Sequence, residues 1–191
     1  MRPRSRKVAL CIMGASGFAL AGCQQEQVEA QAYPDLASCE AAAERDGLLS
    51  QGECADAFAD AQALHVESAP RYENLEVCEA EHGEGACGSE AEVAEGGSGG
   101  IFMPLLAGYL IGNMMGGRGM AAAQPLYRTP DGRFTNASRG SVYSSNSGRT
   151  QLAPSQFARP AATAGQPPMT QATANSRGGF GSTGGARGFG G

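Results

Sequence analysis

Two copies of a short cysteine motif limit what this chain can fold into. Residues 33–41 and 72–80 both read Tyr-x-(Asp or Asn)-Leu-x-x-Cys-Glu-Ala, and each copy is followed by a second cysteine. The cysteines concerned are Cys39 and Cys54, then Cys78 and Cys87. An even number of cysteines in a small domain predicts two disulfide bonds, provided that the chain reaches an oxidising compartment.

The N-terminus predicts such an export. Basic residues among the first seven precede an apolar run from Val8 to Leu20, which has the length of a signal-peptide core and is too short to span a bilayer. The run ends in Leu20-Ala21-Gly22-Cys23, which resembles the lipobox of bacterial lipoproteins. The resemblance implies a diacylglycerol on Cys23 as the new N-terminus and, because Gln24 follows rather than Asp, an outer-membrane location facing the periplasm. The alternative is an ordinary secretory signal that is cleaved elsewhere.

The pairing of the four remaining cysteines is open, because four cysteines allow three connectivities. The repeat favours Cys39–Cys54 and Cys78–Cys87, so that each copy closes its own loop. Closing a loop of this size stabilises a fold by roughly 2–3 kcal/mol in the chain-entropy model. A zinc site is the alternative use of these residues, but the closely spaced pairs typical of zinc ligands are missing here.

Helix signals surround these cysteines. Asp35 and Asn74 are favourable N-caps, because a short side-chain oxygen can accept hydrogen bonds from the first turn of a helix. Cys54–Glu67 is rich in alanine, lacks Gly and Pro, and predicts the longest helix. We therefore expect a mostly α, disulfide-stapled domain over residues 33–90, with an apolar core so thin that stability depends on the disulfides.

A second apolar segment, residues 101–117, follows a glycine-rich linker. Pro104 suits the first turn of a helix, and Gly108, Gly112 and Gly116 recur every four residues. On a helix these glycines would share one face, the small-xxx-small pattern of closely packed membrane helices. The segment is short for a membrane span. A helix that lies on the membrane or self-associates is the favoured interpretation, and a helix that docks on the domain is the alternative.

Charge is segregated along the chain. Residues 24–117 hold 18 acidic and two basic residues, whereas residues 118–191 hold eight arginines and Asp131. The basic tail is poor in large apolar residues, and this composition predicts disorder, with a hairpin turn at Pro130-Asp131-Gly132 as a local exception. Arg-Gly-Gly-Phe-Gly at residues 177–181 is similar to nucleic-acid-binding tails. The export signal favours anionic lipid, cell-wall polymer or an acidic protein face over nucleic acid, and a contact with the acidic part would be salt-sensitive.

Catalytic motifs are missing from the sequence. His65 and His82 are the two histidines, and neither stands beside a serine or cysteine in an arrangement typical of a nucleophile and its base. The many carboxylates are typical of a solvated acidic surface. The sequence therefore predicts a protein that is not an enzyme and that has neither a cofactor nor a metal.

Several of these motifs together resemble one family. Leu20–Cys23, Gly83–Cys87, Met103–Tyr109 and Arg177–Gly181 are similar to the YgiB-like family of exported proteins of Gram-negative bacteria, a domain of unknown function. The resemblance covers residues 20–135 and the short tail motif. It implies no catalytic residue. It implies a neighbouring ATP-grasp ligase, similar to glutathionylspermidine synthetase, as a candidate partner.

We therefore expect a non-enzymatic lipoprotein of the bacterial cell envelope with a structural or interaction role, anchored to the membrane through Cys23. Self-association through residues 101–117 is a further expectation, and an accessory binding module for the ATP-grasp ligase is the alternative function. The expected division of the chain is a signal peptide at 1–22, a tether at 23–32, the disulfide domain at 33–90, a linker at 91–100, the apolar glycine-spaced helix at 101–117 and the disordered tail at 118–191.

Overall fold

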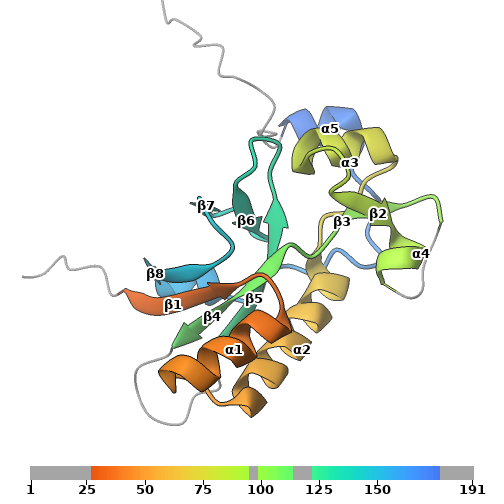
Figure 1. Ribbon diagram of the computed structural model, residues 1–191. Helices are drawn as coiled ribbons and strands as arrows, with labels where there is room; N and C mark the ends of the chain where they lie inside the picture. Colours follow the sequence, from red (N-terminus) through yellow and green to blue (C-terminus); the bar gives the residue numbers. More distant parts are fainter. Residues whose placement is uncertain (1–26, 95–98, 114–121, 177–191) are drawn as a thin grey trace, which may run out of the picture.

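A computed structural model describes residues 27–94, 99–113 and 122–176 (Figure 1). The fold combines a curved six-stranded antiparallel sheet, two helices on one face of it, and a smaller lobe built around a two-stranded sheet. The strands are β1 (Val28–Tyr33), β2 (Cys87–Ser89), β3 (Phe102–Pro104), β4 (Gly108–Asn113), β5 (Ala122–Arg128), β6 (Phe134–Asn136), β7 (Val142–Tyr143) and β8 (Gly148–Leu152). The helices are α1 (Leu36–Asp46), α2 (Gln51–Ser68), α3 (Leu75–His82), α4 (Glu90–Val93), the 3₁₀ turn η1 (Pro154–Phe157) and α5 (Gln171–Ser176).

The large sheet joins segments that are far apart in the sequence. Its strand order is β7-β6-β5-β4-β1-β8, so the N-terminal strand lies in the interior of the sheet. Glu29 pairs with Asn113 of β4 on one side and with Gln151 of β8 on the other. The small sheet pairs β2 with β3, from Cys87 opposite Pro104 to Ser89 opposite Phe102.

Apolar side chains cover both faces of the large sheet, because successive residues of a strand point to opposite sides. In β4, Tyr109 and Ile111 face α1 and α2, and Tyr109 packs on Phe58 with ring centroids 5.4 Å apart. Leu110 faces the opposite side, where Leu126 and Phe157 complete a second core cluster. The sheet is therefore a central layer with packing on each side.

The helix ends follow the expected capping chemistry. Asp35 accepts a hydrogen bond from the backbone N–H of Ser38 at the start of α1, and Asn74 accepts one from Val77 at the start of α3. The longest helix, α2, begins three residues earlier than expected, because Ser50 and Glu53 form a capping box.

The structure contains both disulfides in the pairing that the repeat favours. Cys39 of α1 is bonded to Cys54 of α2, and Cys78 of α3 is bonded to Cys87 of β2. The first disulfide lies inside the core between the two helices and the sheet. The second joins the helix of the smaller lobe to its two-stranded sheet.

The expectation of a mostly α fold is wrong, because the chain builds a six-stranded sheet. The apolar segment is not a glycine-faced helix: Gly108 and Gly112 lie in the central strand β4. A side chain at Gly108 would collide with the backbone oxygen of Tyr33, and one at Gly112 would collide with the ring of Phe157. The glycines are thus needed for packing within the domain. Gly116 lies outside the described residues.

The prediction of a disordered tail is also wrong over residues 122–176, which form β5 to β8, η1 and α5. The hairpin at Pro130-Asp131-Gly132 is present: Leu126 to Arg128 pair with Asn136 to Phe134, and Gly132 has a φ of +77°. These segments are held by strand pairing, β5 with β4 and β8 with β1, and by large side chains such as Leu126, Leu152 and Phe157 in the core.

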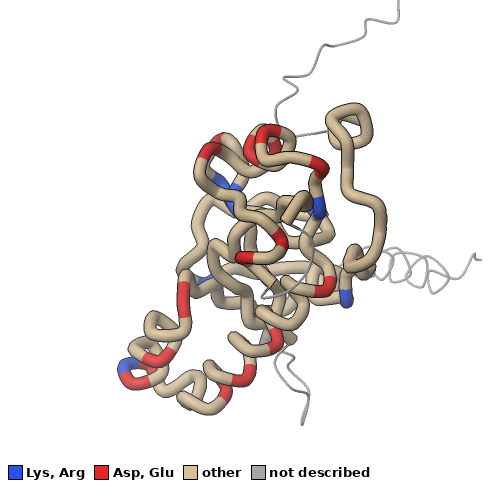
Figure 2. Tube along the Cα trace, turned by 90° about the vertical axis from the view of Figure 1, so that its right-hand side faces the viewer, with Lys and Arg blue, Asp and Glu red and all other residues tan. Residues whose placement is uncertain are grey.

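Opposite charges join the two halves of the chain in defined positions. Arg139 pairs with Glu81 at 3.1 Å, Arg149 approaches Asp46 at 3.9 Å, and Arg159 pairs with Glu67. Figure 2 shows acidic positions spread along the chain and few basic ones. The attraction expected between acidic and basic parts is therefore present, but as specific ion pairs in a folded domain.

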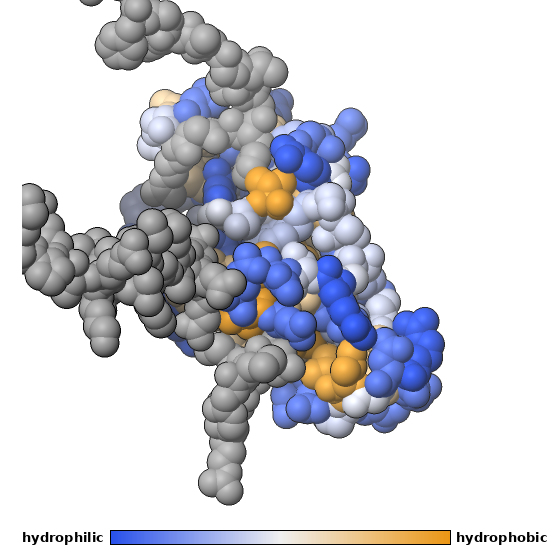
Figure 3. Space-filling model, turned by 90° about the vertical axis from the view of Figure 1, so that its left-hand side faces the viewer, coloured by the Kyte–Doolittle hydropathy of each residue, from blue (hydrophilic) through white to orange (hydrophobic). Residues whose placement is uncertain are grey.

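The surface is mainly polar. Figure 3 shows small apolar patches separated by polar residues on the face that it views. Leu48, at 60% exposure, is the most exposed large apolar side chain among the described residues. No helix in residues 27–94, 99–113 and 122–176 is long and apolar enough to cross a membrane.

Candidate functional site: a cavity beside a buried polar network

A C-terminal segment, residues 160–169, crosses the end of α2, and we call it the strap. The backbone N–H of Thr163 donates to the carbonyl of Glu67 at 2.9 Å, and the N–H of Met169 donates to the carbonyl of Arg71 at 2.7 Å. The N–H of Glu73 donates in turn to the carbonyl of Met169. The strap is thus tied to the chain that leaves α2.

A cavity of about 840 Å³ lies between the strap and the turn that follows β6, and we call it the strap cavity. It is lined by small and apolar residues together with hydroxyl, amide and guanidinium groups. The lining residues are Ser68, Pro70, Arg71, Ala137, Ser138, Arg139, Pro160, Ala161, Ala162, Thr163, Gln166, Pro167 and Met169. Sites for small molecules commonly have volumes of about 300–1,000 Å³, so this cavity is of ligand size.

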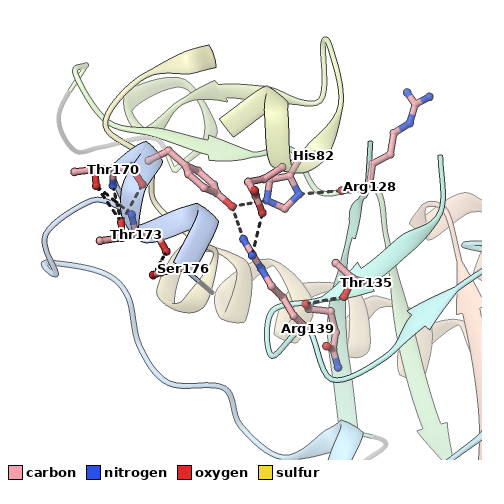
Figure 4. A network of polar contacts seen from close by, with 10 residues as sticks. His82, Arg128, Thr135, Arg139, Thr170, Thr173 and Ser176 are labelled. Carbon is pink, nitrogen blue, oxygen red and sulfur yellow. Dashed lines mark hydrogen bonds and ion pairs between the residues drawn. The ribbon is translucent and has the colours of Figure 1, made fainter. Parts of the chain in front are cut away.

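Arg139 is one of the residues that line the strap cavity, and its side chain belongs to a buried polar network (Figure 4). Its Nη1 donates to Glu81 at 3.1 Å and its Nη2 donates to the hydroxyl oxygen of Tyr72 at 2.6 Å. Tyr72 and Glu81 are both buried. Arg139 also has a φ of +53°, a left-handed conformation that costs a non-glycine residue free energy and is enriched at functional sites.

The network continues from Tyr72 to His82 with a definite direction. The Nδ1 of His82 lies 2.9 Å from the carbonyl oxygen of Arg128, which can only accept, so we assign the ring proton to Nδ1. The Nε2 of the neutral ring then accepts from the hydroxyl of Tyr72, 2.9 Å away. Burial, with a smaller contribution from Arg139, lowers the pKa of His82 to about 4, which keeps the ring neutral at pH 7.

The second guanidinium of the strap cavity, Arg71, has a side chain that is only 4% exposed. Its Nε donates to Glu90 at 2.6 Å, its Nη1 donates to the hydroxyl of Thr163 at 2.6 Å, and its Nη2 donates to the carbonyl of Val66 at 2.8 Å. Arg71 therefore connects the smaller lobe, the strap and the end of α2.

Both histidines of the chain lie in one series of tilted and edge-to-face ring contacts. Tyr72 contacts His82, His82 contacts Tyr127, and Tyr127 contacts His65, with ring centroids 5.6, 6.1 and 5.6 Å apart. The Nδ1 of His65 lies 3.2 Å from the hydroxyl of Tyr127, and its Nε2 is buried without a hydrogen-bond partner. Burial, and to a lesser degree Arg71, lowers the pKa of His65 to about 4. Burial raises the pKa of Tyr127 well above its usual range.

These bonds make the network suitable for support and recognition. Both ring nitrogens of His82 are engaged with protein groups, so this histidine is not placed to accept a proton from a ligand in the cavity. The described ranges contain no group of three or more His, Cys, Asp or Glu side chains that could hold a metal ion. What the arrangement offers is a cavity with two arginines in its lining, each held by a buried carboxylate.

The residues singled out from the sequence lie elsewhere. The four disulfide cysteines stabilise the frame, Gly108 and Gly112 lie in β4, and Cys23 is outside the described residues. The network was not predicted from the sequence, because its members come from α3 and the residues before it, the β5–β6 region and the turn after β6. One signal was present: Arg71 is one of only two basic residues in the acidic part of the chain, directly before the repeated tyrosine.

The fold and cavity define a class of protein, a disulfide-bonded domain of helices and sheet with a ligand-sized cavity. The model of a family described as a protein of unknown function, DUF1190, matches residues 27–190. The chain belongs to this family. The resemblance to YgiB-like proteins is thereby confirmed.

Individual relatives agree with this assignment. The chain is 34% identical over 189 residues to a UPF0441 protein of Klebsiella pneumoniae subsp. pneumoniae, a match that covers 91% of this chain and 78% of the relative. It is 35% identical over 195 residues to a UPF0441 protein of Pectobacterium carotovorum subsp. carotovorum, covering 94% and 81% respectively. No solved structure matches the chain.

Proposed function

We propose that this chain is a non-enzymatic, lipid-anchored binding protein of the bacterial cell envelope, and that the strap cavity is its binding site. The observation that carries the proposal is a cavity of about 840 Å³ with Arg71 and Arg139 in its lining. Both arginines are oriented by buried partners before any ligand arrives. Such pre-organisation lowers the entropic cost of binding.

The envelope location rests on sequence and on the disulfides. A basic N-terminus, an apolar run and Leu20–Cys23 together resemble a lipoprotein signal. The two disulfides favour an oxidising compartment, since disulfides are rare in the cytosol. The sheet begins at Val28, five positions after Cys23, so an acyl group on Cys23 would hold the domain close to the membrane surface.

The binding role, as opposed to catalysis, is supported by how the polar side chains around the cavity are used. The hydroxyl of Ser68 donates to the carbonyl of Leu64, that of Ser138 donates to Asn136, and that of Thr163 donates to the carbonyl of Ala69. A nucleophilic hydroxyl needs an adjacent base, and these hydroxyls contact backbone carbonyls or an amide. An accessory role beside an ATP-grasp ligase stays a prediction from the resemblance.

The anchor is tested by mass spectrometry of the protein purified from membranes. We expect an N-terminal peptide that begins at acylated Cys23, and we expect the Cys23→Ser variant to move to the soluble fraction. Thiol titration of the denatured protein provides the second readout, with no free thiol among the four domain cysteines. Unprocessed protein with reduced cysteines in the cytosol would refute the proposed location.

A further inference from the structure

We propose that the turn between α1 and α2 contacts the membrane surface, with Leu48 inserted among the lipids, so that the anchored domain has one preferred orientation. This inference rests on the lipid anchor of the proposed function and goes beyond it, because an anchor alone leaves the domain free to rotate. It follows from the exposure of Leu48, the structure of its turn, the nearness of the turn to the anchor and the charge around it.

Leu48 is the most exposed large apolar side chain among the described residues. Its exposed fraction is 60%, and the next value in these ranges is 43%, for Leu105. The neighbouring Leu49 is partly buried and packs against the core cluster between the two helices and the sheet. A single exposed leucine is ordinary on a protein surface, so its position decides whether it has a role.

The turn that carries Leu48 is fixed by caps on both sides. Gly47 ends α1 in the left-handed conformation, with a φ of +62°, and its N–H closes the last turn of the helix. Ser50 begins α2 with a capping box. The disulfide Cys39–Cys54 joins the two helices on either side of the turn. Leu48 is therefore presented to solvent by a well-defined backbone.

The turn lies beside the start of the N-terminal strand. Leu48 lines a hollow of about 360 Å³ together with Glu29 and Gln31 of β1, and we call it the turn hollow. β1 begins at Val28, five positions after Cys23. Because an extended chain spans at most about 3.6 Å per residue, an acyl group on Cys23 brings the membrane within roughly 18 Å of the start of β1.

Two other leucines of the described ranges are well exposed, but they lie far from this strand end. Leu75 begins α3, and the backbone N–H of Leu105 donates to the carbonyl of Ala86, so both belong to the smaller lobe. Figure 1 shows this lobe at the end of the molecule opposite to the start of β1. A short tether to β1 therefore favours contact between the lipids and Leu48.

Charge around the turn indicates an apolar contact. The lining of the turn hollow includes Glu29, Glu53 and Arg149, and Arg149 approaches Asp46 at 3.9 Å. Carboxylates outnumber cations here, so this surface has no attraction for anionic lipid. We therefore expect the contact to form on zwitterionic lipid and to persist at high salt, since salt does not screen the burial of an apolar side chain.

The experiment uses the absence of tryptophan from the chain, so that one substitution introduces a single fluorescent reporter. Leu48→Trp places the reporter in the turn, and Leu105→Trp is the matched control in the smaller lobe. The full-length lipidated variants are reconstituted in phosphatidylcholine vesicles with and without bromine on the acyl chains, because brominated chains quench tryptophan on contact. We expect quenching and a blue shift for Leu48→Trp, also at high salt, and neither for Leu105→Trp.

A second measurement keeps the native leucine, because tryptophan itself favours membrane interfaces. In phosphatidylcholine nanodiscs that carry a nitroxide on the acyl chains, the amide NMR signals of Leu49 and Ser50 should be broadened in the parent. Leu48→Gln should remove most of this broadening while the protein stays attached to the lipid, and Leu105→Gln should leave it unchanged. Both leucines are exposed, so both variants should fold, which circular dichroism checks.

Mass spectrometry of the N-terminus and flotation with vesicles separate this contact from the anchor. Protein that is not acylated at Cys23 and does not float would overturn the anchor, and the contact with it. Acylated, floating protein would overturn the contact alone if Leu48→Trp is not quenched, or is quenched no more than Leu105→Trp. A blue shift without quenching would show that a protein surface, such as a second copy, covers Leu48, and would also overturn the contact. Unchanged broadening in Leu48→Gln would overturn the role of Leu48.

Discussion

The contact between Gly112 and Phe157 offers a direct test of the fold. A Cβ atom at position 112 would lie 2.7 Å from two ring carbons of Phe157. Carbon atoms pack at about 3.5–4.0 Å, so the ring would have to withdraw by roughly 1 Å. Phe157 is only 8% exposed and belongs to the core cluster with Leu110 and Leu126, so its ring has little room to move. We expect Gly112→Ala to lower the free energy of unfolding by about 1–3 kcal/mol.

A double-mutant cycle isolates this contact. Phe157→Ala alone should cost about 3–5 kcal/mol, because it removes a buried ring and leaves a void. In that background the added methyl group of Gly112→Ala has space, so its cost should shrink to nearly zero. The expected coupling free energy between the two positions is then about 1–3 kcal/mol.

The assay is guanidinium denaturation of the oxidised protein, followed by far-UV circular dichroism, with Gly99→Ala as the control. An added Cβ at Gly99 would meet no atom within 4 Å, so this substitution should change stability little. If this segment were a helix, Gly112→Ala would instead raise the free energy of unfolding, since Ala is about 1 kcal/mol more favourable than Gly inside a helix. A stabilised Gly112→Ala, or a coupling below about 0.5 kcal/mol, would refute the packing of β4 against Phe157.

Three further predictions concern the disulfides and the network. Replacing both Cys39 and Cys54 by Ala should lower the free energy of unfolding by about 2–5 kcal/mol, measured by denaturation beside the oxidised parent. His65 and His82 have pKa values lowered to about 4. Between pH 6.5 and 4 the unfolded chain therefore binds more protons than the folded one. The free energy of unfolding should decrease as the pH is lowered through this range, by up to about 3 kcal/mol per histidine. Ring NMR titration checks this, and midpoints near 6.5 would contradict it. Tyr72→Phe should cost about 1–3 kcal/mol in denaturation, because Arg139 and His82 both lose a buried partner.

Local signals in the sequence were sufficient for the helical and disulfide part of the fold. The caps at Asp35 and Asn74 and the pairing of each cysteine within its own repeat depend on residues close in the chain. The prediction of a helix over residues 101–117 was wrong for a physical reason. A spacing of four residues places side chains on one face of a helix and also on one face of a strand. Tyr109, Leu110 and Ile111 between the glycines include the aromatic and β-branched types that favour strands.

The remaining strands could not be found from local patterns. Residues 122–152 are polar and rich in small residues between a few buried large side chains, and the outermost strand β8 pairs with β1, more than 100 positions earlier in the chain. The candidate site is likewise built from segments that are distant in the sequence. Tyr72, His82 and Arg139 come together only because the C-terminal end of α3 meets the β5–β6 hairpin, so no spacing in the sequence predicts their contact.

The interior position of β1 has a consequence for how the protein is made. A nascent chain emerges N-terminus first, and β1 is then available long before β8, its neighbour from Gly148 to Leu152. Until that late segment appears, one edge of β1 is left without its partner, so the sheet cannot be completed in step with synthesis. Pairings between such distant segments make folding slow. A chain that stops before residue 148 should therefore be a substrate for chaperones and proteases, even though it contains both disulfide loops.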